Sequence, residues 1–278
     1  MQKIIFLDVD GTLVDDNGVI PETAKFAVKQ ARSNGHLVFL CTGRSISILF
    51  PEVLEIGFDG IVGAAGGYIE LNGEVLFHEV IKKDNLQLVV DYFNKHEIDF
   101  FLETNGGLFA SKSCKESIRV LIDNLFANEQ DSQAELRKSM LSFYNSIIEE
   151  EELVRDDINK IGFLGSAVPI ESITQQFPTI FSVIPSTVPF FGTNSGEVSI
   201  FGIHKASAIE KVIEHLGINK ENTYAFGDGS NDIEMLQFVQ YGVAMGNAKE
   251  EVKKAANDIT DRHDEDGIYN SFKKYGLI

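Results

Sequence analysis

The stretch Ile4-Ile5-Phe6-Leu7-Asp8-Val9-Asp10-Gly11-Thr12 decides the fold of this 278-residue chain. Four consecutive apolar residues run directly into two acidic residues. An uninterrupted apolar run of this length is typical of a strand that is buried on both faces of a parallel sheet. Two residues apart in an extended chain, the side chains of Asp8 and Asp10 are expected to point the same way. The chain therefore begins with a buried strand that carries carboxylates at its end.

The segments that follow this strand indicate alternating helices and strands. Residues 21–35 have apolar residues at helical spacing, and a second apolar run at 37–40 ends in Cys41-Thr42-Gly43-Arg44. The last third of the chain repeats the pattern, with helices over 206–216 and around Met235 and Val252, and strands over 224–226 and 242–245. Such strand–helix–strand units predict an α/β fold with a Rossmann-like parallel-sheet core.

The middle of the chain has a different pattern. Its apolar residues predict helices over 86–93 and 118–126, a hairpin over 98–102 and 107–110, and strands over 160–164, 180–184 and 190–193. This mixture indicates an α+β module inserted into the α/β domain. We therefore expect a core of residues 1–82 and 190–278 and an inserted cap domain of residues 83–189.

The composition limits the partners of the protein. There are 42 acidic against 24 basic residues, for a formal net charge of −18. This balance argues against nucleic acid and anionic membrane partners, which need clustered Lys and Arg. The two cysteines, Cys41 and Cys114, have neither disulfide-framework nor zinc-ribbon spacing, and no signal peptide or membrane-spanning run is evident. The expected location is the cytoplasm.

Four polar clusters stand where predicted core strands end or helices begin, and functional groups of open α/β sheets collect at the carboxyl ends of strands. They are Asp8-Val9-Asp10, Thr42-Gly43-Arg44, Lys205 and Gly227-Asp228-Gly229-Ser230-Asn231-Asp232. The paired carboxylates suit a hard cation. A calcium loop of the EF-hand type is excluded, because Leu13, Val19 and Ile233 occupy positions that such a loop reserves for Gly or Glu. The Thr-Gly pair could bind a phosphoryl oxygen or simply cap the strand end.

In this order, the four clusters resemble the motifs of the haloacid dehalogenase-like hydrolase superfamily: DVDGT at 8–12, the Thr of TGR at 42–44, Lys205, and GDGSND at 227–232. The long insert and the segment VAMGNA at 243–248 resemble the Cof-type branch, whose members are mostly sugar-phosphate phosphatases. The chain departs from that branch at Ala64-Ala65-Gly66-Gly67, where Asn-Gly-Ala is usual.

The resemblance implies a Mg²⁺-dependent phosphatase that hydrolyses a small phosphorylated metabolite through an aspartyl-phosphate. Asp8 would be the nucleophile, and Asp10 would be the general acid and then the general base. Mg²⁺ would lie between Asp8, the backbone carbonyl of Asp10 and Asp228. The remaining residues would hold the phosphate or support the site: Thr42, Gly43, Lys205 and Asn231 for the phosphate, Asp232 orienting Lys205 or a metal-bound water, and Arg44 pairing with the substrate or with the carboxylates of the fourth motif.

Two alternatives remain open. A phosphomutase would use the same aspartyl-phosphate and return the group to a sugar. A phospho-accepting signalling domain also uses Asp, Mg²⁺, Thr and Lys, although its phosphorylated Asp follows a later strand and its chain is shorter. A binding protein without catalysis is disfavoured, because every chemical position is filled. The cap would close over the core and determine specificity, but the sequence predicts neither the particular substrate nor the oligomeric state.

Overall fold

The structure, a computed structural model, describes residues 2–15, 18–127, 134–186 and 189–278. The chain divides into two compact units, the first comprising Met1–Arg44, Leu49–His78 and Ile203–Ile278, and the second Ser45–Ile48 and Glu79–Gly202. The insert was expected over 83–189, so both of its ends differ. The larger difference is at the second end, where residues 190–202 belong to the second unit, because a strand at 196–200 pairs within the sheet of that unit.

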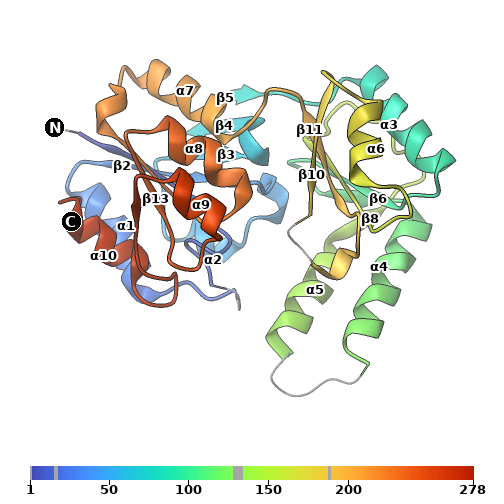
Figure 1. The fold of residues 1–278 in the computed structure, drawn as a ribbon, viewed down its shortest axis with the longest axis horizontal. Helices are drawn as coiled ribbons and strands as arrows, with labels where there is room; N and C mark the ends of the chain where they lie inside the picture. The colour runs from blue at the N-terminus through green and yellow to red at the C-terminus, as the bar shows by residue number, and fades with distance from the viewer. Residues whose placement is uncertain (1, 16–17, 128–133, 187–188) are drawn as a thin grey trace. The chain divides into compact units, whose positions relative to one another are not determined.

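The first unit is built on an eight-stranded sheet with the order β14-β13-β12-β1-β2-β3-β4-β5 (Figure 1). Its strands are β1 (Ile4–Leu7), β2 (Leu37–Cys41), β3 (Gly60–Gly63), β4 (Tyr68–Leu71), β5 (Glu74–His78), β12 (Thr223–Gly227), β13 (Tyr241–Ala244) and β14 (Asp258–Ile259). Neighbours from β14 to β3 are parallel, whereas β4 and β5 are antiparallel. The predicted parallel-sheet core is confirmed.

Helices cover both faces of this sheet. They are α1 (Glu22–Ser33), α2 (Pro51–Leu54), α7 (Lys205–Leu216), α8 (Ile233–Phe238), α9 (Glu250–Ala255) and α10 (Gly267–Lys274), with short 3-10 helices at Ala64–Gly66, Lys220–Asn222 and Ser230–Asp232. Apolar residues of α7, α8 and α9 share one cluster with Ile4 and Phe6 of β1 and with Ala225 of β12. Because strand side chains alternate, Phe226 faces the other side, where its ring lies 5.3 Å from that of Phe272 in α10.

The second unit has a six-stranded sheet with the order β10-β11-β9-β6-β7-β8, antiparallel except between β7 and β8. Its elements are β6 (Phe100–Glu103), β7 (Leu108–Ala110), β8 (Ile147–Glu149), β9 (Lys160–Phe163), β10 (Phe181–Pro185), β11 (Gly196–Ile200), α3 (Lys83–Lys95), α4 (Lys112–Leu125), α5 (Ala134–Ser146), α6 (Ile170–Gln176) and 3-10 turns at Ile46–Ile48 and Pro189–Phe191. One apolar cluster joins the sheet to α3 and α6, and another joins it to α4 and α5. The predicted α+β character of the insert is confirmed.

The strand expected at 190–193 is wrong. Residues 189–191 form a 3-10 turn, and the strand begins at Gly196. Phe190 and Phe191 pack into the cluster with α4 instead of joining the sheet, and Gly192 turns the chain with φ +92°. The expected hairpin is confirmed as β6 and β7.

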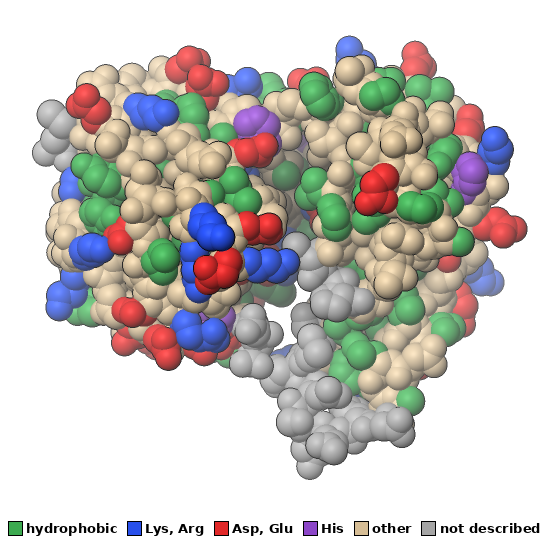
Figure 2. All heavy atoms as spheres, in the orientation of Figure 1, with side chains coloured by type: hydrophobic (Ala, Val, Ile, Leu, Met, Phe, Trp, Pro, Cys, Tyr) green, Lys and Arg blue, Asp and Glu red, His purple; other side chains and the backbone are tan. Residues whose placement is uncertain are grey.

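The surface and the thiols agree with the composition. On the face of the molecule in Figure 2, acidic and basic side chains are interspersed and no extended basic patch is visible. Among the described residues, the helices are too short or too polar to cross a membrane. Cys41 and Cys114 are both buried free thiols.

Candidate active site

The candidate site lies where neighbouring parallel strands end. Strands β13, β12, β1, β2 and β3 are adjacent in the sheet, so the segments that follow them meet at one edge. In that order, these segments carry Asn247, Asp228, Asp8, Thr42 and Ala64. The strand order therefore brings together three of the four sequence clusters, and the start of α7 adds Lys205 as the fourth.

Asp8 follows β1 directly, and its backbone N–H donates to the carbonyl of Phe226 on β12 (3.0 Å). The chain then turns tightly: Gly11 N–H donates to Val14 O (2.9 Å) and Val14 N–H donates to Val9 O (2.8 Å). Gly11 has φ +76°, and a Cβ at this position would lie 2.3 Å from Oδ2 of Asp228. Glycine is required here because the loop backbone approaches the Asp228 carboxylate so closely.

Lys205 is a buried cation between two carboxylates. Its Nζ donates to Oδ1 of Asp8 (2.6 Å) and to Oδ1 of Asp232 (2.5 Å), and its side chain is only 1% exposed. Burial alone would lower the pKa of Lys205, but Asp232 and Asp8 raise that pKa above its ordinary value. Burial and Asp232 raise the pKa of Asp8 well above its ordinary value, against the opposing effect of Lys205.

The N-terminus of α7, the helix that carries Lys205, is stabilised by a cap. His204 caps α7: its Nδ1 accepts from Ser207 N–H (3.2 Å), and its own backbone N–H donates to Ser207 Oγ (3.1 Å). This reciprocal pair satisfies N–H groups that a helix start leaves without intrahelical partners. The cap holds Lys205, the first residue of the helix, in place.

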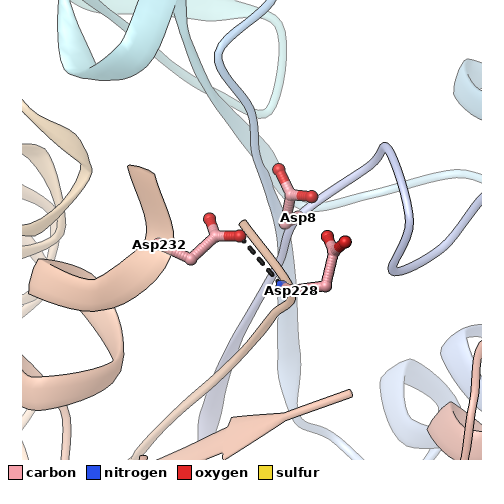
Figure 3. A group of neighbouring side chains, drawn as sticks. All are labelled: Asp8, Asp228 and Asp232. Carbon is pink, nitrogen blue, oxygen red and sulfur yellow. Dashed lines mark hydrogen bonds between the residues drawn. The ribbon is translucent and has the colours of Figure 1, made fainter. Parts of the chain in front are cut away.

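The two carboxylates of the fourth cluster are held differently (Figure 3). Asp232 has one oxygen on Lys205, while its Oδ2 accepts from the backbone N–H groups of Asp228 (3.0 Å) and Gly229 (2.9 Å). From the side chains that the structure describes, the Asp228 carboxylate receives two long bonds, from Thr12 Oγ1 (3.4 Å) and Asn247 Nδ2 (3.4 Å). Burial and the charge of Asp232 raise the pKa of Asp228 to about 7. Asp232 therefore holds the loop, whereas the oxygens of Asp228 accept only weak hydrogen bonds from Thr12 and Asn247.

These carboxylates fit a divalent cation. Asp8, Asp228 and Asp232 each offer an oxygen, and the three oxygens lie within 4.8 Å of one another. Mg²⁺ prefers a few carboxylate oxygens and keeps several waters. Burial, together with the charge of Asp232, raises the pKa values of Asp8 and Asp228, so a cation placed between these carboxylates would favour their ionised forms. The donor set and its charge therefore match a hard cation.

Arg44 binds Asp10, a partner that the sequence analysis did not name, and its pairing with the substrate or the fourth-cluster carboxylates stays a prediction. Its Nε donates to Oδ2 and its Nη2 to Oδ1 of Asp10, both at 2.7 Å. The guanidinium also lies 4.4 Å from the ring centre of Phe50. The Asp10 side chain is 53% exposed, so it is within reach of solvent while Asp8 is buried. A planar guanidinium suits this two-point pairing.

Thr42 and Gly43 lie in the loop that follows β2. Thr42 is buried, and its Oγ1 accepts from Arg44 N–H (3.1 Å). A Cβ on Gly43 would lie 3.6 Å from Nδ2 of Asn231, so this loop and Asn231 are neighbours. All the predicted site residues of the first unit are therefore brought to one edge of its sheet.

Two features of the site were missed in the sequence. The first is Asn247, whose Nδ2 donates to Gly11 O (2.8 Å). Its position just after a core strand was the available signal. The second is the turn at Ala64 and Ala65, both left-handed at φ 50° and 54°. Their N–H groups donate to Arg44 O (2.8 Å) and Thr42 O (3.1 Å), so this turn supports the Thr42 loop. Nothing in its composition indicates that conformation.

Comparison with known proteins agrees with this arrangement. The family model described as haloacid dehalogenase-like hydrolase matches residues 5–272. The 5-amino-6-(5-phospho-D-ribitylamino)uracil phosphatase YcsE of Bacillus subtilis (strain 168) is 28% identical over 99% of this chain and 96% of its own. Among solved structures, a hypothetical protein of Geobacillus kaustophilus HTA426 matches with a TM-score of 0.83 and 31% identity. The subclass IIB sugar phosphatase BT4131 matches with a TM-score of 0.77 and 26% identity. Both matches cover 100% of this chain and 100% of the other chain.

Proposed function

Since this chain belongs to the haloacid dehalogenase-like hydrolases, as a phosphatase of their Cof-type branch, we propose that it hydrolyses a small phosphorylated metabolite, such as a sugar phosphate, through an aspartyl-phosphate and with Mg²⁺. The observation that carries the proposal is the buried Lys205 between Asp8 and Asp232, with Asp228 beside them. A desolvated carboxylate next to a fixed cation is suited to attack an anionic phosphate.

In the first step, an oxygen of Asp8 forms a bond to phosphorus as the bond from phosphorus to the ester oxygen breaks. The departing alcohol takes a proton from Asp10. In the second step, water attacks phosphorus, Asp10 takes a proton from that water, and the bond from Asp8 to phosphorus breaks to release inorganic phosphate. Asp10 is exposed and can therefore reach the alcohol and the water, and one of its two oxygens would leave Arg44 to carry the proton.

Mg²⁺ would be held by Asp8, Asp228 and the backbone carbonyl of Asp10, and when bound it would offset the repulsion between the nucleophile and the phosphate. Asp232 is not assigned as a ligand in this proposal, because its oxygens already accept from Lys205 and from two backbone N–H groups. Its role is to hold Lys205 and the loop that carries Asp228.

Thr42, Gly43, Lys205 and Asn231 would bind the phosphoryl oxygens. The hydroxyl of Thr42 accepts from Arg44 N–H, which orients the hydroxyl so that its own proton can be donated to the substrate. Lys205 would stabilise the negative charge that develops on these oxygens as the phosphoryl group is transferred.

The second unit is the proposed source of specificity, as a cap domain. Support for a small substrate comes from the relatives, whose names specify a phosphorylated ribitylamino-uracil and sugar phosphates. A cytoplasmic location is part of the proposal and accords with two buried free thiols.

The direct test compares release of inorganic phosphate from an aryl phosphate by the wild type and by Asp8→Asn, with Mg²⁺ and with EDTA. We expect Asp8→Asn or EDTA to reduce the rate at least about 1,000-fold. The matched control is Asp15→Asn on the same loop, which keeps the Oδ1 that accepts from Val19 N–H and should keep full activity. Equal rates for wild type and Asp8→Asn would refute the nucleophile. Transfer to a sugar without phosphate release would indicate a mutase instead.

A further inference from the structure

The side chain of Asn247 connects three segments at the edge of the site. Its Nδ2 donates to the backbone carbonyl of Gly11 (2.8 Å) and, at 3.4 Å, to Oδ2 of Asp228. Its Oδ1 accepts from the backbone N–H of His263 (3.2 Å). One amide group thus joins the loop after β1, the loop after β12 and the segment after β14.

The backbone that carries this amide is itself held in place. Met245 N–H donates to Gly227 O (3.0 Å), the residue just before Asp228, and Gly246 N–H donates to Asp261 O (3.1 Å). A Cβ on Gly246 would lie 2.8 Å from Arg262 N, so the turn is tightly packed against its neighbour. Asn247 is therefore presented to the site by a turn with little freedom to move.

Asn247 contacts one proposed cation ligand and the residue next to another. Gly11 directly follows Asp10, whose carbonyl is a proposed ligand, and Asp228 is another. Asp228 is held by no short hydrogen bond from Thr12 or Asn247, since both donors lie at 3.4 Å. Two long, neutral contacts can direct a carboxylate without neutralising it, which leaves its charge for a cation.

Only an amide fits all of these contacts at once. Nδ2 supplies two donors, and Oδ1 supplies the acceptor that His263 N–H requires. Leucine has nearly the same shape but neither function, and alanine leaves space as well. Carboxylate in place of the amide would turn a donor into an acceptor facing Gly11 O.

We propose that Asn247 is a positioning residue for the cation site. It raises the affinity for Mg²⁺ by holding the Gly11 backbone and the Asp228 carboxylate in a fixed position relative to each other. The inference rests on the proposed function, because it takes Asp228 and the Asp10 carbonyl as ligands. It adds a residue that would act on the cation site through Gly11 and Asp228.

The experiment is calorimetric titration of substrate-free protein with Mg²⁺, for the wild type, Asn247→Ala and Asn247→Leu. Loss of a residue that orients ligands typically weakens metal binding about 10- to 100-fold. We expect that increase in Kd in both variants, with kcat at saturating Mg²⁺ within about threefold of wild type. The matched control is Asn257→Ala, which removes another side-chain bond to the backbone, from Gly242 N–H to Asn257 Oδ1 (2.8 Å), away from the site.

The outcomes separate the two proposals. Folded Asn247 variants that bind Mg²⁺ as tightly as wild type would overturn the inference and leave the phosphatase proposal intact. Equal weakening by Asn257→Ala would also overturn it, since the effect would then be general loosening of the fold. If the wild type binds Mg²⁺ but releases no phosphate, the proposed function fails while the Kd comparison still decides the role of Asn247. A wild type that binds no Mg²⁺ overturns both. If Asn247→Ala does not fold, Asn247→Leu decides, because it keeps the volume.

Discussion

Each unit of the molecule contains a buried lysine between two carboxylates. In the first unit, Lys205 Nζ lies 2.6 Å from Asp8 and 2.5 Å from Asp232. In the second, Lys160 Nζ lies 2.8 Å from Glu197 and 3.5 Å from Glu103, and its side chain is only 4% exposed. Both lysines are buried and paired with two carboxylates, yet only the first cluster is proposed to perform chemistry.

The difference lies in the backbone and in the balance of charge. Lys160 and Glu103 are directly opposed residues of two antiparallel strands, so their pairing is part of a sheet. Lys205 and its partners come from a helix start and from loops after parallel strands. Four carboxylates, Asp8, Asp10, Asp228 and Asp232, face the two cations Lys205 and Arg44 there, which leaves two negative charges, the amount that one Mg²⁺ offsets. A buried lysine between acids therefore does not by itself mark a catalytic site.

The largest difference between the two clusters is expected when each lysine is removed in turn. Lys205→Met should lower kcat/KM by about 100- to 1,000-fold, the usual loss for one group that stabilises transition-state charge. Lys160→Met should leave kcat/KM on an aryl phosphate within about tenfold and lower the unfolding free energy by about 3–5 kcal/mol, because it leaves the buried Glu103 carboxyl without its cation. Steady-state kinetics and urea unfolding of both variants measure this contrast. Equal losses of activity would mean that the two clusters do not differ in function.

Without the metal, the raised carboxyl pKa values of both clusters should make the stability depend on pH. The pKa of Asp228 is raised from 3.8 to about 7, so the folded protein binds this proton more tightly than the unfolded chain does. The unfolding free energy of EDTA-treated protein should therefore fall as pH rises from about 4 to about 7. The raised pKa values of Asp8 and Glu103 act in the same sense.

Mg²⁺ at 100 times its Kd should add about 2.7 kcal/mol at pH 8 and less at pH 5. Asp228→Asn should abolish that increment, whereas Glu103→Gln should leave it unchanged. Thermal unfolding followed by circular dichroism at both pH values provides the comparison. If Glu103→Gln abolished the gain in unfolding free energy on adding Mg²⁺, the cation would be bound in the second unit, which would contradict the account.

The smallest expected effect concerns the backbone beneath the first cluster. Gly11→Ala places a Cβ 2.3 Å from Asp228 Oδ2 without changing any charge, and we expect about a tenfold loss of kcat. Gly217→Ala is the matched control, because Gly217 is also left-handed, at φ +64°, but no atom lies within 4 Å of the added Cβ. It should cost only about 1 kcal/mol of unfolding free energy. Unchanged activity in Gly11→Ala would show that the position of Asp228 does not limit the reaction.

Much of the core could be predicted from the sequence because its strands are uninterrupted apolar runs. Residues 4–7, 37–40 and 224–226 all lie in buried parallel strands, and the polar clusters after them meet as expected. The strand β11 was missed. Its residues Gly196–Ile200 are only partly buried, and the adjacent Phe190 and Phe191 gave a stronger apolar signal for a turn that packs against α4.

The contacts between loops could not be predicted, because they depend on how separate segments meet. Arg44 binds Asp10, a residue 34 positions away, and Asn247 binds Gly11 at a separation of 236. Residue type alone left Arg44 with several acidic partners to choose from. The left-handed Ala64 and Ala65 likewise follow from backbone bonds to the Thr42 loop rather than from any preference of alanine.

The most direct test of the central claim is to detect phosphate on Asp8. A dinitrophenyl phosphate has a leaving group that needs no proton, so Asp10→Asn should still be phosphorylated but should hydrolyse the intermediate slowly. Acid quenching during turnover, followed by mass spectrometry of peptides, should find a Mg²⁺-dependent phosphoryl group on Asp8 in that variant and none in the double variant with Asp8→Asn. Phosphate on another residue, or turnover by the double variant at the rate of Asp10→Asn, would contradict the account.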